Sequence, residues 1–84
     1  MYYVYILKSL RDGGFYVGKS EILKDRIKQH ARGEVKSTKD RRPLVLVYFE
    51  ASNSSKDANH REIYLKTAWG KRYIKNRIKN DITI

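Results

Sequence analysis

Two short aromatic segments joined by a glycine-rich turn constrain the fold of this 84-residue chain more than any other feature. Residues 2–9 and 15–18 are rich in tyrosine, valine and isoleucine, which favour strands. Residues 12–14 between them read Asp-Gly-Gly, a strong hairpin signal. The two segments are therefore predicted to pair as antiparallel strands. Because side chains alternate along a strand, a suitable register brings Tyr5 and Tyr16 to the same face of the hairpin.

The next segment has the apolar period of a helix over residues 21–32. Ser20 is the expected N-cap and Gly33 the expected stop. Arg26 and His30 are four residues apart and are predicted to project side by side from the edge of the packed face. The buried stripe of this helix is expected to consist of Leu23, Ile27 and Ala31.

Residues 34–42 have no apolar period and are predicted to form a loop that ends in a basic cluster. Pro43 then introduces residues 44–49, which read LVLVYF. A run that is apolar on both faces is typical of an internal strand. The third strand is therefore expected here, at an internal position in the sheet.

The last third of the chain is predicted to form two helices. Ser54 is the expected cap of a helix over residues 55–69, and Gly70 is expected to separate it from a short basic helix over residues 71–79, held by Ile74 and Ile78. The inner stripe of the longer helix is expected to contain Ala58, Glu62, Leu65 and Trp69. Glu62 is the one acidic residue of the chain that this pattern places on an apolar stripe. The element order is β-β-α-β-α-α.

The overall charge indicates a polyanionic partner. Nineteen lysines and arginines against nine acidic residues give a net charge of +10, which favours nucleic acid because neutralised phosphates release counterions. A chain of 84 residues is expected to form one domain, residues 1–84, because so short a chain buries a single core. No cysteine is present, so disulfides, thiolate metal sites and a cysteine nucleophile are excluded, in keeping with a reducing cytoplasm. Membrane binding is disfavoured because no segment has transmembrane length or a broad apolar face opposite a wholly basic one.

An inward carboxylate requires either an ionic partner or a metal ion. Glu62 is therefore interpreted as paired with Arg26 or another base, or as the ligand of one Mg²⁺ or Mn²⁺ ion whose shell water completes. Hydrolysis of a phosphodiester additionally needs a cation on the phosphate, for which the guanidinium of Arg26 is suited. A tyrosine can accept the proton of the attacking water only with help from a metal or a nearby cation such as Lys19, because a free phenol has a pKa of about 10. His30 is a further candidate proton carrier.

The order of these residues resembles that of the GIY-YIG nuclease superfamily. The residues that carry the resemblance are YVY, Tyr16 of YVG eleven residues after Tyr5, the following lysine, L-x-x-R-x-x-x-H and R-E-x-x-L-K. YVY keeps the final tyrosine of the first motif and replaces its glycine by Tyr3. The segments VYILKS, KSTKDRRPLVLVYFE and HREIYLKTAWGKR are similar to small stand-alone members, which are related to the nuclease domain of the excision-repair C subunit.

This resemblance implies an α+β fold with a three-stranded antiparallel sheet flanked by about three helices. It also implies a divalent-metal-dependent endonuclease that hydrolyses DNA by a single-metal mechanism, with a role in DNA repair or recombination. The roles that it implies are motif tyrosines for Tyr5 and Tyr16, phosphate binding for Arg26, and metal binding for Glu62. The remaining residues that it matches are His30 on the helix after Arg26, Lys19 as the cation after the second motif, and Asn76 as a late asparagine.

Two other functions fit the same residues. A non-catalytic module on this fold would bind DNA or RNA through the basic third helix and through Lys36, Lys39, Arg41 and Arg42. A subunit of a repair complex would become active only on a protein partner that supplies target recognition. The general base stays open between Tyr5 and Tyr16.

Overall fold

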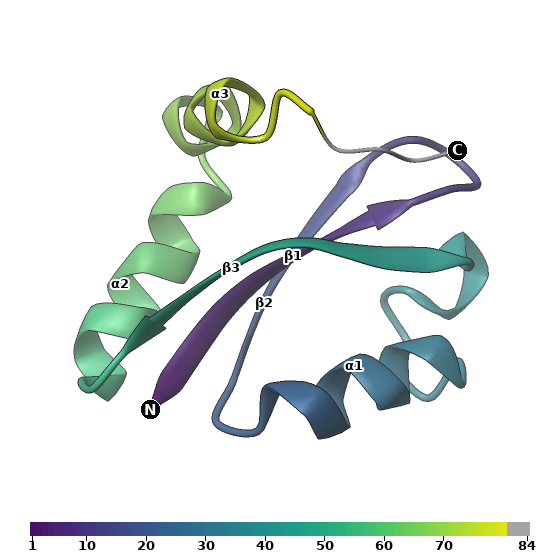
Figure 1. The fold of residues 1–84 in the computed structure, drawn as a ribbon, viewed down its shortest axis with the longest axis horizontal. Helices are drawn as coiled ribbons and strands as arrows, with labels where there is room; N and C mark the ends of the chain where they lie inside the picture. Colours follow the sequence, from purple (N-terminus) through teal and green to yellow (C-terminus); the bar gives the residue numbers. More distant parts are fainter. Residues whose placement is uncertain (81–84) are drawn as a thin grey trace.

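The computed structural model describes residues 1–80, and its sheet is built on the predicted hairpin (Figure 1). Strand β1 (Tyr2–Ser9) pairs antiparallel with β2 (Phe15–Ser20). In the turn, Gly13 has a φ of +75°, a conformation that glycine adopts without strain. The amide of Gly14 donates to Oδ1 of Asp12 at 2.7 Å. The hairpin prediction is confirmed, and β2 extends to Ser20.

Strand β3 (Leu44–Ser52) pairs antiparallel with the other side of β1, so the strand order is β2-β1-β3. The three-stranded antiparallel sheet and the element order β-β-α-β-α-α are therefore confirmed. The expected internal position of the third strand is wrong, because β1 occupies the centre and β3 an edge. The residues of its apolar run are half-buried except for Phe49, which is exposed. Partial cover on both faces thus produced the pattern of an internal strand.

Helix α1 (Leu23–Ala31) begins later than predicted, and its predicted stripe is covered only in part, because Leu23 and Ile27 are half-buried. Its N-cap is Ile22, and the hydroxyl of Ser20 instead accepts a hydrogen bond from the Ile22 amide at 3.1 Å, so the predicted cap is wrong. Ala31 is exposed, whereas His30 is the one buried residue of this helix. A polar side chain faces the sheet because hydrogen bonds satisfy both of its ring nitrogens.

Helices α2 (Ser55–Leu65) and α3 (Ala68–Arg77) are separated earlier than predicted. The Ser54 hydroxyl accepts from the Asp57 amide at 3.2 Å, which confirms the first cap. The chain then breaks at Thr67, whose hydroxyl accepts from the Gly70 amide and caps α3. Gly70 does not end a helix but allows close packing, because a Cβ there would lie 2.1 Å from the Tyr64 carbonyl oxygen. Trp69 therefore belongs to α3 and is 68% exposed, so its predicted place on the inner stripe is wrong.

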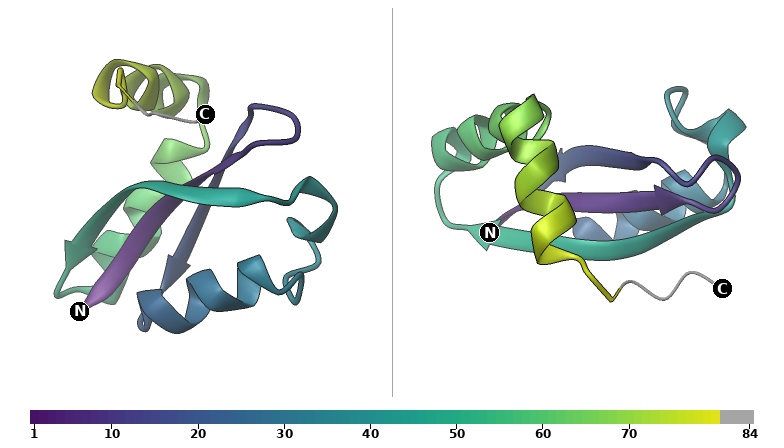
Figure 2. Two further views of the ribbon diagram at one scale, coloured as in Figure 1. Left: turned by 45° about the vertical axis from the view of Figure 1, so that its right-hand side comes forward. Right: turned by 90° about the horizontal axis from the view of Figure 1, so that it is seen from above.

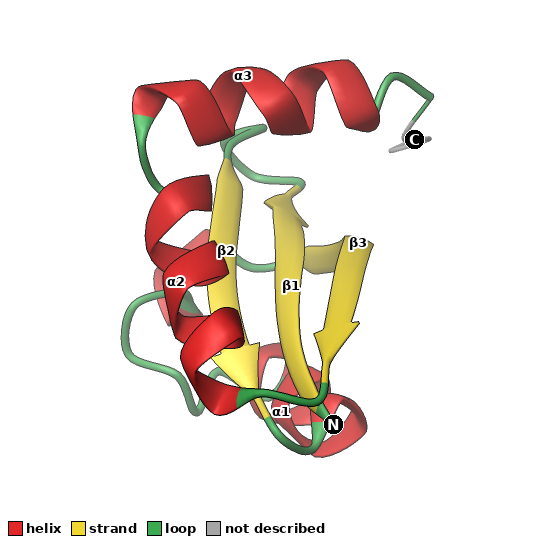
Figure 3. Cartoon of the chain, turned by 90° about the vertical axis from the view of Figure 1, so that its left-hand side faces the viewer, coloured by secondary structure: helices red, strands yellow, loops and turns green. Residues whose placement is uncertain are grey.

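The helices cover the two faces of the sheet unequally (Figures 2 and 3). Helix α1 lies on one face, α2 lies on the other, and α3 crosses the end of the sheet near the β1–β2 turn (Figure 3). The core lies on the α2 side and is formed by Val4, Ile6, Ala58, Leu65 and Ile74. Among the described residues no helix is long and apolar enough to cross a membrane.

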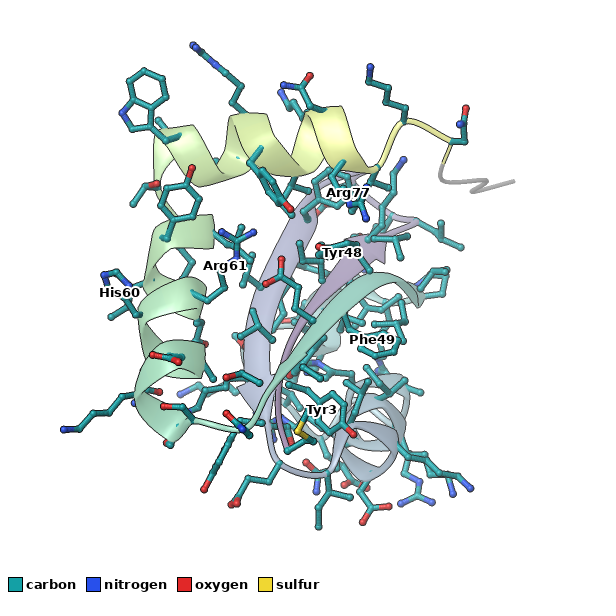
Figure 4. The ribbon with its side chains drawn as sticks, turned by 60° about the vertical axis from the view of Figure 1, so that its left-hand side comes forward. Tyr3, Tyr48, Phe49, His60, Arg61 and Arg77 are labelled. Carbon is teal, nitrogen blue, oxygen red and sulfur yellow. The ribbon has the colours of Figure 1, made fainter. Side chains whose placement is uncertain are left out.

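A polar cluster joins β3 to the two C-terminal helices. Arg61 of α2 donates to both carboxylate oxygens of Glu50 at 2.8 and 2.9 Å, and Tyr48 donates to the same carboxylate at 2.9 Å. Figure 4 shows Arg61, Tyr48 and Arg77 on the same side of the sheet. Burial raises the pKa of Tyr48 to about 12, so it stays a neutral donor. Glu50 is thus a second partly buried acid, which the sequence pattern missed. Its bidentate ion pair with Arg61 holds α2 against β3 at the residue before Glu62.

Candidate active site

Tyr5 lies at the centre of the face that α1 covers. It is fully buried, and its position on β1 is opposite Gly18 of β2. A Cβ on Gly18 would lie 2.4 Å from both Cζ and the hydroxyl oxygen of Tyr5. The glycine of the second motif therefore makes room for the phenol end of Tyr5, which lies over the edge strand. Tyr16 shares this face because it is opposite Leu7, as the alternation predicted.

A chain of hydrogen bonds runs inward from the Tyr5 phenol. Its hydroxyl lies 2.8 Å from Nε2 of His30, and Nδ1 of the same ring lies 2.7 Å from Oγ1 of Thr38. Burial, together with the positive charge of Arg26, lowers the pKa of His30 to about 4. The imidazole is therefore neutral at pH 7, with one nitrogen that donates and one that accepts. It links two hydroxyl groups and can receive a proton from Tyr5.

Thr38 comes from the segment that was predicted to be a loop. The segment contains a short 3₁₀ helix, Lys39–Arg41, and Thr38 is fully buried beside it. Two contacts hold this segment against the hairpin: the Ser9 hydroxyl donates to the Arg41 carbonyl at 2.6 Å, and the Arg41 guanidinium pairs with Asp12 at 2.8 Å. The hydrogen bond from Arg41 lowers the pKa of Asp12 to about 2. The hairpin turn thus positions the threonine that orients His30.

Three candidate residues act electrostatically on the Tyr5 phenol. Burial raises the pKa of Tyr5, a hydrogen bond from Arg26 opposes that rise, and the charges of Tyr16 and Glu62 add to it. The residues concerned come from β2, α1 and α2, and Glu62 on α2 acts only through its charge and has the smallest effect. Of the six residues predicted to be catalytic, Tyr5, Tyr16, Arg26 and His30 therefore form one cluster, on which Glu62 acts through its charge.

Tyr16 and Arg26 lie at the accessible side of this cluster. Tyr16 is half-buried, its ring packs edge-on against His30 at 5.3 Å between centroids, and its hydroxyl lies 3.4 Å from Oγ of Ser37. Arg26 donates to Oε1 of Gln29 at 2.9 Å, one turn further along α1. Within residues 1–80 its side-chain partners are Gln29 and the Tyr5 phenol, both neutral, so its charge is available to an anion.

Glu62 lies on α2 with its side chain 24% exposed. Of the two interpretations made from the sequence, an ion pair is present, but its partner is Lys66 at 3.4 Å rather than Arg26. Lys66 is 55% exposed, and a pair of this kind contributes little to stability. Lys19 donates to Oδ1 of Asn59, one turn before Glu62 on the same helix. The accessible carboxylate and the Lys19 amine therefore lie near each other at the β2 edge.

The residues predicted to contact nucleic acid are spread over two regions. Lys36, Lys39 and Arg42 are exposed on the segment that contains Thr38, and Asn76 is exposed on α3. Arg41 is half-buried and carries the ion pair with Asp12. The first region adjoins Ser37 and hence Tyr16, so these cations flank the cluster.

Replacing Thr38 with valine is expected to destabilise the protein. The substitution keeps the shape of the side chain but leaves Nδ1 of a buried imidazole without its partner, which costs about 1–3 kcal/mol. We expect a lower urea midpoint at pH 7 with an unchanged m-value. The control is Thr38→Ser, which keeps the hydroxyl. Equal midpoints for the two variants would show that the hydrogen bond contributes nothing to stability.

Sequence reasoning missed Thr38, Gln29 and Asn59, each of which holds a candidate site residue. None of the three is a specified position of a motif, although Thr38 lies in the KSTKDRRPLVLVYFE segment, and each is a common polar residue in a polar segment. A signal for Thr38 existed only indirectly, because a buried histidine requires a partner for each ring nitrogen.

The comparisons with known proteins identify the family of the chain. The model of the GIY-YIG catalytic domain matches residues 1–79. UPF0213 protein CPE1444 of Clostridium perfringens is 45% identical over 67 residues, which cover 79% of this chain and 71% of that protein. UPF0213 protein SH2523 of Staphylococcus haemolyticus is 43% identical over 67 residues, 79% of this chain and 80% of that protein. No solved structure matches the chain. The match over nearly the whole chain, together with these relatives, shows that the chain belongs to the GIY-YIG family.

Proposed function

We propose that this protein is a divalent-metal-dependent endonuclease that hydrolyses phosphodiester bonds of DNA. The observation that carries the proposal is the convergence on one phenol of a neutral histidine, an arginine and a carboxylate. Such a set supplies a proton acceptor, a phosphate-binding cation and a metal ligand. The net charge of +10 and membership of a family whose domain is typically a nuclease support it.

The residues present fit one hard divalent ion. Glu62 offers an accessible carboxylate whose only described ionic partner is a weakly held lysine. Among residues 1–80 no group of three or more His, Cys, Asp or Glu side chains could hold a metal ion, so the protein would supply one carboxylate and water the other ligands. Mg²⁺ and Mn²⁺ tolerate such a shell. When bound, the ion would supply positive charge at the phosphate and lower the pKa of water near it.

The protein residues divide the remaining work. The guanidinium of Arg26 would move from the phenol to the scissile phosphate, because its paired N–H donors match two phosphate oxygens. This movement uncovers the Tyr5 hydroxyl, which then accepts the proton of the attacking water as its own proton passes to Nε2 of His30. Tyr5 is favoured over Tyr16 as the general base because it has this proton acceptor 2.8 Å away. Thr38 keeps the imidazole in the orientation that the transfer requires.

Lys19 and the flanking cations would hold the DNA backbone. The Lys19 amine is bound to Asn59, one turn before Glu62 on α2, and Lys36, Lys39 and Arg42 are exposed on the segment beside Tyr16, so the two groups would lie on either side of the cluster. Asn76 would contact the strand from α3. A role in repair or recombination follows if the target is a branched or damaged structure that a protein partner locates.

The test is incubation of the protein with branched, nicked, duplex and single-stranded DNA in Mg²⁺ or Mn²⁺, with the matching RNA strands in parallel. We expect cleavage of at least one DNA that stops on chelation and weakens as salt rises. If no substrate is cut with either metal while DNA binding is normal and unaffected by Glu62→Ala, the protein is a binding module rather than a nuclease.

A further inference from the structure

A groove of about 660 Å³ lies between the turn end of the β1–β2 hairpin and the junction of α2 with α3. Figure 3 shows α3 crossing this end of the sheet. The floor of the groove is apolar and includes Phe15, Val17 and Ile74, while Lys66, Lys71 and Lys75 line its rim. Its volume falls within the roughly 300–1,000 Å³ of sites that enclose a small ligand.

The groove opens beside the candidate active site. Tyr16, on the α1 face of the edge strand, also lines the groove. Lys66 on its rim is the residue that pairs with Glu62 at 3.4 Å. A ligand in the groove would therefore contact Lys66, the ionic partner of Glu62, and strand β2 at Tyr16. Neither the groove nor its three lysines has a part in the chemistry described so far.

The residues that line the groove suit a nucleotide as the ligand. An apolar floor with an aromatic ring accepts the face of a base, and a cationic rim accepts the phosphates on either side of it. Lys71 and Lys75 are four residues apart on α3, so both amines project from the same side of that helix. A base in a regular duplex has both faces covered by its neighbours and cannot enter; only an unpaired nucleotide can do so.

Building on the proposed function, we infer that this groove binds one unpaired nucleotide of DNA next to the phosphate that is cut. The protein thereby selects substrates with a bulge, a flap or a single-stranded end. The selection is exerted in binding, before any bond is broken, so it can be measured without cleavage.

The experiment uses the wild-type protein without divalent metal and two DNA duplexes that differ by a single feature. In one duplex a 2-aminopurine nucleotide is bulged, and in the other it is paired. We expect the bulged duplex to bind at least about fivefold more tightly, the weaker end of what one base contact with an aromatic side chain contributes, and its fluorescence to change on binding. Phe15→Leu, which keeps apolar volume in the floor and so preserves the fold, should remove this difference.

The lysine rim is tested by the double variant Lys71→Gln/Lys75→Gln. It should reduce the slope of log Kd against log salt for the bulged DNA by about 1.4, since each phosphate contact on a single strand contributes about 0.7. The matched control is Lys24→Gln/Lys56→Gln, which removes two exposed cations that do not line the groove. This control should preserve the preference for the bulged duplex.

The inference and the proposed function can fail separately. Equal affinity for the two duplexes, or a preference that survives both groove variants, overturns the inference even if the protein cuts DNA. Concentration-dependent self-association without DNA that Phe15→Leu abolishes would overturn it too, by assigning the groove to a second copy of the chain. A preference that depends on the groove in a protein that cuts nothing supports the inference and refutes the nuclease.

Discussion

Replacing Glu62 with glutamine is expected to lower the rate of DNA cleavage by on the order of 10²-fold or more, the loss typical of removing one preorganised electrostatic group. The amide keeps the size of the side chain but cannot supply the anionic oxygen that Mg²⁺ or Mn²⁺ prefers. The charge of Glu62 also acts on the Tyr5 phenol, which places the carboxylate within reach of the cluster. The measurements are single-turnover cleavage and titration of Mn²⁺ followed by electron paramagnetic resonance.

The fold should survive this change. The ion pair lost is an exposed one with Lys66 and contributes at most about 1 kcal/mol. Glu34→Gln is the matched control, because Glu34 is an exposed acid outside the cluster and its replacement changes the net charge equally. If Glu62→Gln bound Mn²⁺ as tightly as wild type and cut at the same rate, Glu62 would not be the metal ligand.

The sequence predicted those parts of the fold that depend on local signals. The Asp-Gly-Gly turn specified the hairpin because Gly13 needs a positive φ, and Ser54 specified the start of α2 because its hydroxyl accepts from the Asp57 amide. Strand order was not predictable in this way. Whether β1 or β3 lies at the centre depends on pairing between distant segments, and the apolar run of β3 fits an edge strand that is half-buried on both faces.

The end of α2 illustrates competition between two local signals. Gly70 is a strong helix breaker by propensity, yet it lies inside α3 because the chain packs too closely there for any side chain. Thr67, an unremarkable residue in the sequence, ends the preceding turn by capping the next helix. This shift of a few residues is what moves Trp69 from the expected inner stripe to the surface.

The candidate site was predicted through spacing, and its interior was not. Four-residue spacing placed Arg26 and His30 side by side, and alternation placed Tyr5 and Tyr16 on one face. The burial of His30 could not be read from its helix, since the partners that make burial tolerable are Tyr5, 25 residues earlier, and Thr38, in a segment without apolar period. Nucleic-acid contacts, metal binding and catalytic roles stay predictions until the experiments above are done.

Replacing Tyr5 with phenylalanine is expected to lower the cleavage rate by about 10²–10⁴-fold, the usual contribution of a general base. The ring stays over Gly18, while the hydroxyl that passes its proton to His30 is lost. Because burial raises the pKa of Tyr5, the phenol is neutral at pH 7; the ionised phenol accepts the proton of water without any transfer to His30, so the wild-type rate should rise as the phenolate forms through the alkaline range. That rise should disappear in Tyr5→Phe, measured as single-turnover rates from pH 7 to 9.

Loss of activity must be separated from loss of stability, because Tyr5→Phe also leaves a buried imidazole nitrogen without a partner, at a cost of about 1–3 kcal/mol. Thr38→Val is the matched control: it removes the other hydrogen bond of the same ring at a similar cost but keeps the phenol, so it should retain the pH rise. Rates are compared above pH 7 because His30, with its pKa lowered to about 4, favours the unfolded state as pH falls from about 6.5 towards 4. If Tyr16→Phe lost more activity than Tyr5→Phe and abolished the rise of rate with pH, Tyr16 would be the general base. The buried hydrogen bonds that link Tyr5, His30 and Thr38 would then serve to position Arg26.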